Sequence, residues 1–283
     1  MSRQPISDLP RATLLRAELS RVDGADPGET GTAPIAKHRR MAENPFRFLR
    51  GSAQLFYTDL KNGRLELPPA LSEGPPLTTL TGDCHLSNFG FLTEQGSHGD
   101  QVVFCPNDYD DACVGPAVWD LARFLVSLPL AVNYTRELLE RIYAANESDS
   151  LASLRAPSLD AIEKAGQAFL KAYSKACQRV MCDPEYRLAA LDQIPKRHVL
   201  HKAFRKACRR AAGGRDFTTK STLAKEVKLR EVPLRFRERP ERFARLEPER
   251  AKAIAYAFRP HVDDAILDLV QRLGTGTGTL DPW

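Results

Sequence analysis

Apolar and polar residues change their period along the chain. Between residues 77 and 108 there are three short apolar runs, LTTLTGD, NFGFLTE and QVVFCPND, which predict β-strands. The stretch QGSHGD lies between the last two and predicts a hairpin. After Gly115 the period becomes helical in AVWDLARFLVSLPLAV, with Pro116 suited to the first turn. The pattern predicts an α+β fold, mostly helical after a small antiparallel sheet.

Further helices are predicted on both sides of this region. NPFRFLRGSAQLFYTDL repeats its apolar residues at helical spacing and is expected to be one helix against the body of the protein. SLDAIEKAGQAFLKAYSKACQRVM predicts an amphipathic helix that Ser158 or Asp160 caps. KLREVPLRF predicts a strand and PERAKAIAYAFRPHVDDAILDLVQRL a long helix. The stretch DGADPGETGTAP is rich in Gly, Pro, Thr and acid, so we predict a flexible arm over residues 1–34 and one domain over residues 35–283.

Composition excludes some classes of protein. The chain has 283 residues, of which 42% are hydrophobic, so it can bury a substantial core. A net charge of +5 requires neither a nucleic-acid nor a membrane partner. The six cysteines form no C-x-x-C pair, which favours a reducing compartment, and no apolar run is long enough to span a membrane. We therefore expect a cytoplasmic protein.

Two acidic clusters follow predicted strands, in TGDCHLSNFGF and in NDYDDA. Asp83 and Asn88 are five residues apart on the first loop, and Asp108 begins the second. Carboxylates on neighbouring loops repel each other, so a cation between them would explain the arrangement. Carboxylate and amide oxygens suit Mg²⁺, which takes few ligands from protein and leaves other positions to water and phosphate.

These motifs resemble those of kinase-like enzymes. GDCHLSN resembles the G-D-x-x-x-x-N catalytic loop of aminoglycoside and choline phosphotransferase-type kinases, and FCPNDYDDACVGPAVWDLA resembles their next strand, metal-binding Asp and D-L-A helix. FRFLRG, GDCHLSNFG, NDYDDA and GPAVWDLARFLVSL together resemble the bacterial family called domain of unknown function 2252, which is grouped with kinase-like folds. The resemblance begins near residue 37 and implies a protein-kinase-like fold with an aminoglycoside phosphotransferase-type catalytic lobe.

The resemblance also implies roles for single residues. Asp83 matches the general base, Asn88 and Asp108 match the metal ligands, and Asp120 matches a structural Asp. The implied activity is Mg²⁺- and ATP-dependent phosphoryl transfer from a nucleotide to the hydroxyl of an unknown small-molecule or protein acceptor.

The chain departs from the kinase pattern in its nucleotide-binding parts. Neither a G-x-G-x-x-G loop nor a V-A-I-K strand precedes Asp83. The resembled family places a glycine-rich segment after the catalytic loop, and here the chain ends in RLGTGTGTLDPW. Gly274, Gly276 and Gly278 are therefore candidate nucleotide-binding residues in a rearranged or truncated nucleotide lobe; the other interpretation is a frayed tail. The candidates to replace the kinase lysine are Lys37, Lys61 and Arg50.

Two other functions stay open. Without the lysine strand, the chain would be a catalytically impaired kinase-like binding module. With His85 beside Asp83, it would be a metal-dependent phosphoester hydrolase that activates water. The eight Lys and Arg residues from Lys196 to Arg215 are interpreted as the solvated face of an amphipathic helix, because no exposed aromatic residues interleave them for base stacking. A nucleic-acid partner is therefore not expected.

Overall fold

The computed structural model describes residues 10–24, 26, 36–68, 77–93, 97–140, 155–232, 235–237 and 247–258. The chain divides into two units. The first unit comprises Met1–Gly90 and Phe104–Ala190, and the second comprises Phe91–Val103 and Leu191–Trp283. The sequence predicted one domain from residue 35, whereas the structure divides this stretch between the two units. The catalytic and metal-ligand candidates all belong to the first.

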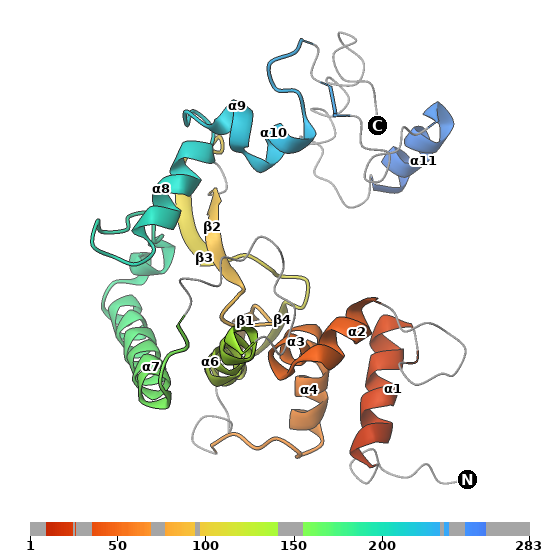
Figure 1. Cartoon of the computed structure of the whole chain (residues 1–283), viewed down its shortest axis with the longest axis vertical. Coiled ribbons are helices and arrows are strands. Elements are labelled where there is room, and N and C mark those ends of the chain that lie inside the picture. Colours follow the sequence, from red (N-terminus) through yellow and green to blue (C-terminus); the bar gives the residue numbers. More distant parts are fainter. Residues whose placement is uncertain are drawn as a thin grey trace. The chain divides into compact units, whose positions relative to one another are not determined.

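The first helix, α1 (Arg11–Asp23), lies within the predicted arm. It packs beside α4 (Ala53–Lys61), as Figure 1 shows. Leu14 is buried, and the two guanidinium nitrogens of Arg11 bind the Asp59 carboxylate at 2.5 and 2.8 Å. The arm prediction is therefore wrong for these residues, because an apolar contact and an ion pair to α4 hold them in place.

A pair of short helices, α2 (Ala36–Glu43) and α3 (Pro45–Gly51), precedes α4. Asn44 separates them and caps α3, because its Oδ1 accepts a hydrogen bond from the Phe46 amide at 2.7 Å. The single helix predicted over residues 44–60 is broken at Ser52, where φ is −134°. A Cβ at Gly51 would lie 2.7 Å from Met41 Cγ, so α2 and α3 approach each other closely at this glycine.

Within the described residues, four strands form two sheets of two strands each. The predicted strands are present as β1 (Leu77–Leu80), β2 (Phe89–Thr93) and β3 (Val102–Pro106). β2 pairs with β3, as the predicted hairpin requires. β1 pairs antiparallel with β4 (Cys113–Pro116), in the register Leu77 with Pro116 and Leu80 with Cys113. The placement of Pro116 in a first helical turn is therefore wrong, because this residue ends an edge strand that needs no donor from it.

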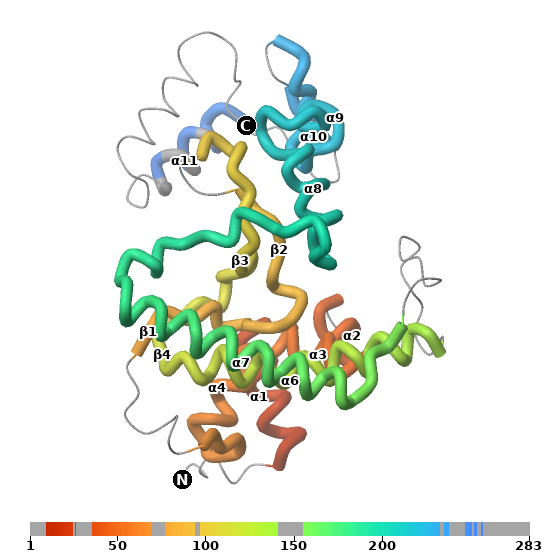
Figure 2. Tube along the Cα trace, turned by 90° about the vertical axis from the view of Figure 1, so that its left-hand side faces the viewer, coloured from red at the N-terminus to blue at the C-terminus, as the bar shows by residue number. Residues whose placement is uncertain are grey.

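The helix after β4 is α6 (Val118–Leu139), and α7 (Leu159–Cys182) lies alongside it in Figure 2. The rings of Phe124 and Phe169 join the two helices, with centroids 4.2 Å apart. Of the two predicted caps, Ser158 is the one that accepts the Ala161 amide, at 3.2 Å. A short 3₁₀ helix, η3 (Pro184–Leu188), follows α7.

The second unit contains α8 (His201–Arg210), α9 (Phe217–Lys220), α10 (Thr222–Glu226) and α11 (Pro248–Phe258). The ring of Phe204 on α8 lies 5.6 Å from the ring of Phe91, which is in the middle of β2. In the described residues, the strand predicted from KLREVPLRF is reduced to a bridge between Val227 and Phe236.

The fold is thus α+β, with several helices and small two-stranded sheets. None of the described helices is both long and apolar enough to cross a lipid bilayer.

Candidate functional site

The loop from residue 81 to residue 88 connects β1 to β2 and is fastened to the start of α6. The Asp120 carboxylate accepts hydrogen bonds from the Thr81 amide at 2.7 Å, the Thr81 hydroxyl at 3.0 Å and the Gly82 amide at 3.2 Å. A carboxylate in the first turn of a helix that binds backbone amides fixes the position of those amides. The expected structural role of Asp120 is therefore confirmed by its contacts.

The two acidic loops lie against each other. Gly82 has φ +82°, and a Cβ on this residue would overlap the carbonyl oxygen of Asp111. The Asn107 amide donates to the Asn88 carbonyl at 3.2 Å, and the Gln54 side chain donates to the Asp111 carboxylate. Burial, and then the nearby charge of Asp83, raise the pKa of Asp111. The proximity predicted for these loops is confirmed, and it depends on glycine at position 82.

Asp83 is buried, and both of its carboxylate oxygens have partners. Oδ1 is paired with Arg123 Nη2, and Oδ2 lies 3.2 Å from His85 Nε2. Arg123 is 1% exposed; its Nη2 also donates to the Leu49 carbonyl at 2.8 Å, and its guanidinium lies 5.3 Å from the centre of the Phe56 ring. Sequence reasoning missed Arg123. Its spacing of three from Asp120 on a helix was the available signal, because it puts both residues on one face.

His85 supports Asp83 from the other side. The Ser87 amide donates to His85 Nδ1 at 3.1 Å, so Nδ1 carries a lone pair and the proton of the neutral ring is on Nε2. This assignment directs the N–H group at Asp83. His85 is 1% exposed, and the Phe46 ring meets it edge-on with centroids 6.0 Å apart. The imidazole is therefore committed to orienting the carboxylate.

Asn88 and Asp108 are the two candidate metal ligands. The Asn88 amide nitrogen donates to the Asp83 carbonyl at 2.9 Å, which leaves Oδ1 as the atom that this side chain can present to a cation. Asp108 is exposed just after β3. In the described part of the chain no cluster of three or more His, Cys, Asp or Glu is placed to hold a metal. Two oxygen donors fit Mg²⁺, which usually keeps several waters and binds substrate phosphates.

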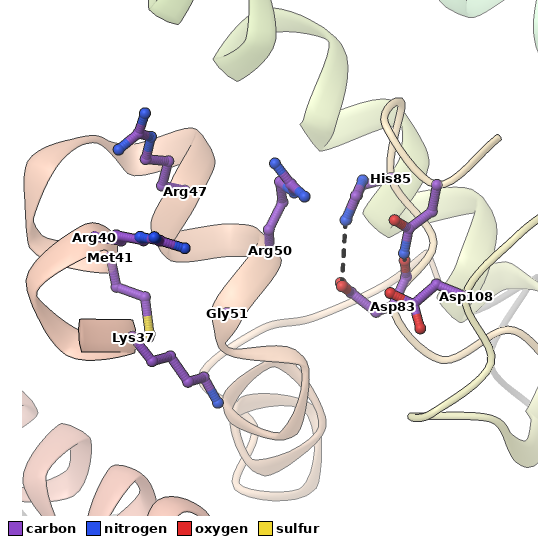
Figure 3. Close-up of a pocket in the computed structure, with 10 residues that line it drawn as sticks. Lys37, Arg40, Met41, Arg47, Arg50, Gly51, Asp83, His85 and Asp108 are labelled. Carbon is purple, nitrogen blue, oxygen red and sulfur yellow. Dashed lines mark hydrogen bonds and ion pairs between the residues drawn. The ribbon is translucent and has the colours of Figure 1, made fainter. Parts of the chain in front are cut away.

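These side chains line a cavity of about 540 Å³. α2 and α3 form one wall and the two acidic loops form the other, as Figure 3 shows. The lining residues are Lys37, Arg40, Met41, Arg47, Arg50, Gly51, Asp83, His85, Asn88 and Asp108. The volume lies within the range of small-molecule sites, and the lining is unusually rich in charge.

The candidate nucleotide-binding residues do not all lie in this cavity. Lys37 and Arg50 lie in this cavity, whereas Lys61 lines a separate, more apolar cavity beside Tyr57 and Trp119. The glycines at positions 274, 276 and 278 lie outside the described residues.

One known protein family matches most of the chain, including the two acidic loops. A model of the DUF2252 family, described as an uncharacterized protein conserved in bacteria, matches residues 32–271. The chain belongs to the DUF2252 family. The match covers FRFLRG, both acidic loops and the start of α6, so the site described above lies inside the DUF2252 region. Neither the curated proteins nor the solved structures gave a match.

Proposed function

We propose that this DUF2252 protein is a Mg²⁺- and ATP-dependent phosphotransferase with a kinase-like catalytic lobe, acting on a hydroxyl acceptor. One observation supports the proposal above the others. Asp83, Asn88 and Asp108 line one cavity, opposite a wall of cationic side chains. Phosphoryl transfer needs these parts, namely a base for the hydroxyl, oxygen ligands for a divalent cation and positive charge for the phosphates.

Asp83 is the proposed general base. Its two oxygens carry about four lone pairs, and the recorded partners use one on each oxygen, so Oδ2 retains a lone pair for an acceptor hydroxyl. Arg123 and His85 hold the carboxylate in one orientation. This preorganisation favours transfer because positioning supplies much of the rate enhancement in this chemistry.

Asn88 Oδ1 and the Asp108 carboxylate are the proposed ligands of Mg²⁺. A bound Mg²⁺ would neutralise charge on the transferring phosphoryl group. The residues of this chain contribute position: the hydrogen bond from Asn88 to the Asp83 carbonyl keeps the proposed metal ligand and the proposed base in register.

A second candidate function is a kinase-like binding module without turnover. The specific observation in its favour is the buried ion pair between Asp83 and Arg123, because it gives this carboxylate a structural partner within the protein. We do not pursue a hydrolase, because the His85 ring that suggested this function is buried and its Nε2 contacts the Asp83 carboxylate.

The test is a transfer assay with γ-labelled ATP, Mg²⁺ and pools of small hydroxyl compounds and of proteins. Asp108→Asn removes a proposed metal ligand at an exposed position, and Asp110→Asn is the matched control, because Asp110 is also exposed but does not line the cavity. We expect labelled product with the wild type and with Asp110→Asn, and a loss of at least about 100-fold with Asp108→Asn. Metal-dependent ATP binding without product in any pool would favour the binding module. Product formation that is equal in both variants would refute the assigned metal site.

A further inference from the structure

The wall formed by α2 and α3 carries four cationic side chains, and their charges are not equivalent. Lys37 Nζ lies 2.6 Å from the Asp23 carboxylate, and Arg47 is paired with Glu43. In the described part of the chain, Arg40 and Arg50 form no salt bridge. Two of the four cations are thus neutralised by the protein itself, and two are left for a ligand.

The opposite wall has a similar division. The Asp83 charge is balanced by Arg123, so Asp108 is the carboxylate of this cavity that is left for a cation. A cavity with two unpaired arginines on one side, and one unpaired carboxylate with an amide oxygen on the other, fits a ligand of mixed charge. A polyphosphate that carries a divalent cation has this distribution.

Arg50 is well placed to make such a contact. In Figure 3 its guanidinium extends from α3 across the cavity toward His85, while Arg47 is directed away. The Arg50 guanidinium lies 6.0 Å from the centre of the buried Phe46 ring. The neighbouring Leu49 carbonyl accepts the hydrogen bond from Arg123, so the backbone beside Arg50 is tied to the partner of Asp83. Because the backbone of Arg50 is held in place, this arginine loses less conformational entropy when its planar guanidinium binds an anion.

We propose that Arg40 and Arg50 form a polyphosphate-binding subsite. This inference rests on the proposed function and specifies how that site holds its donor. The ligand class is a diphosphate or triphosphate group with a bound divalent cation, either free or as part of a nucleotide. The two guanidinium groups bind phosphate oxygens from the α2–α3 side, and Asp108 and Asn88 face the cation from the loop side.

The experiment measures binding of inorganic tripolyphosphate and of ATP to the full chain by titration calorimetry, with and without Mg²⁺. The variants are Arg40→Gln and Arg50→Gln. The matched control is Arg39→Gln, which removes the same charge from an exposed position of α2 that does not line the cavity. Circular dichroism and thermal unfolding verify that each variant is folded, and Arg50→Lys, which keeps the charge, provides a second comparison.

We expect Arg40→Gln and Arg50→Gln each to weaken binding of Mg²⁺-tripolyphosphate by roughly tenfold, with Arg39→Gln close to the wild type. Arg50→Lys should retain part of the affinity. Affinity equal in all three Gln variants, or no binding of tripolyphosphate and ATP by the wild type at millimolar concentration, would overturn the subsite.

Failure of this subsite is distinguishable from failure of the phosphotransferase proposal. Arginine-dependent binding without any phosphoryl transfer would leave the subsite standing and remove the enzyme activity. Phosphoryl transfer that is insensitive to Arg40→Gln and Arg50→Gln would support the enzyme activity and remove the arginine subsite. ATP binding that depends on these arginines, with no binding of tripolyphosphate, would show that the nucleoside is required and would overturn the part of the inference that rests on polyphosphate alone.

Discussion

Replacing Arg123 with methionine should destabilise the first unit severely. The side chain is 1% exposed and pairs with Asp83, which is also buried. Removing one partner of a buried ion pair leaves the other charge unpaired and typically costs about 3–5 kcal/mol. The hydrogen bond to the Leu49 carbonyl adds about 1 kcal/mol, while the methylene packing that methionine retains offsets part of the loss. We expect Arg123→Met to lower the free energy of unfolding by about 4 kcal/mol.

The assay is urea unfolding followed by tryptophan fluorescence. The two tryptophans are at positions 119 and 283, so a Trp283→Phe background leaves Trp119 on α6 as the reporter of the first unit. Arg136→Met is the control on the same helix, because the hydrogen bond that Arg136 donates among the described residues is to the Pro157 carbonyl, at 3.2 Å and near the surface. The control should lose less than about 1 kcal/mol.

A double-mutant cycle separates the pair from general damage to the helix. Asp83→Asn alone leaves a buried arginine unpaired, and the double variant with Arg123→Met leaves no unpaired charge. The double variant should therefore be more stable than the sum of the single losses predicts, by at least about 2 kcal/mol. Losses that add within about 0.5 kcal/mol, or equal losses for Arg123→Met and Arg136→Met, would refute the reasoning.

Three other predictions follow from the same geometry. Gly82→Ala should cost roughly 3 kcal/mol or more of unfolding free energy, because φ is +82° and the new Cβ would overlap a backbone carbonyl; Gly63→Ala, with φ +64° and open space around it, should cost only about 1 kcal/mol in the same urea titration. Burial raises the pKa of the Cys84 thiol to about 11, so the folded state keeps a proton that the unfolded chain loses near pH 9. Stability should therefore fall between pH 9 and pH 11, and urea midpoints should show a smaller fall in Cys84→Ala but not in Cys177→Ala. Asp23→Asn should raise tripolyphosphate affinity a few-fold, because it removes the carboxylate that pairs with Lys37 at the wall of the cavity. Calorimetry showing unchanged or weaker binding would contradict this prediction.

The sequence was informative where local pattern decides structure. β1, β2 and β3 and the cap at Ser158 could be predicted because alternation, turn residues and capping act over a few positions. β4 was missed because its sequence, CVGP, contains a Gly-Pro pair and its pairing partner lies more than 30 residues earlier. The break at Ser52 was missed for a related reason: the close approach of Gly51 to Met41 is a tertiary contact that no local period records.

The candidate site shows the same division. The acidic motifs and the family resemblance pointed to Asp83, Asn88, Asp108 and Asp120, which the structure places on adjoining loops and at the helix that fastens them. Arg123 was missed because a buried arginine is recognisable only when its carboxylate partner is known. From the sequence, Lys37, Lys61 and Arg50 were indistinguishable as candidate phosphate-binding cations, since cavity lining depends on how α2, α3 and α4 pack.

Calorimetric titration of ATP, in the presence and absence of Mg²⁺, tests the proposed metal site most directly. With the wild-type protein, Mg²⁺ should tighten ATP binding by at least about tenfold. Asp108→Asn should abolish this enhancement, and Asp110→Asn should preserve it. An equal enhancement in wild type and Asp108→Asn, or ATP affinity that does not respond to Mg²⁺ at all, would contradict the proposal that the two acidic loops hold a nucleotide-bound cation.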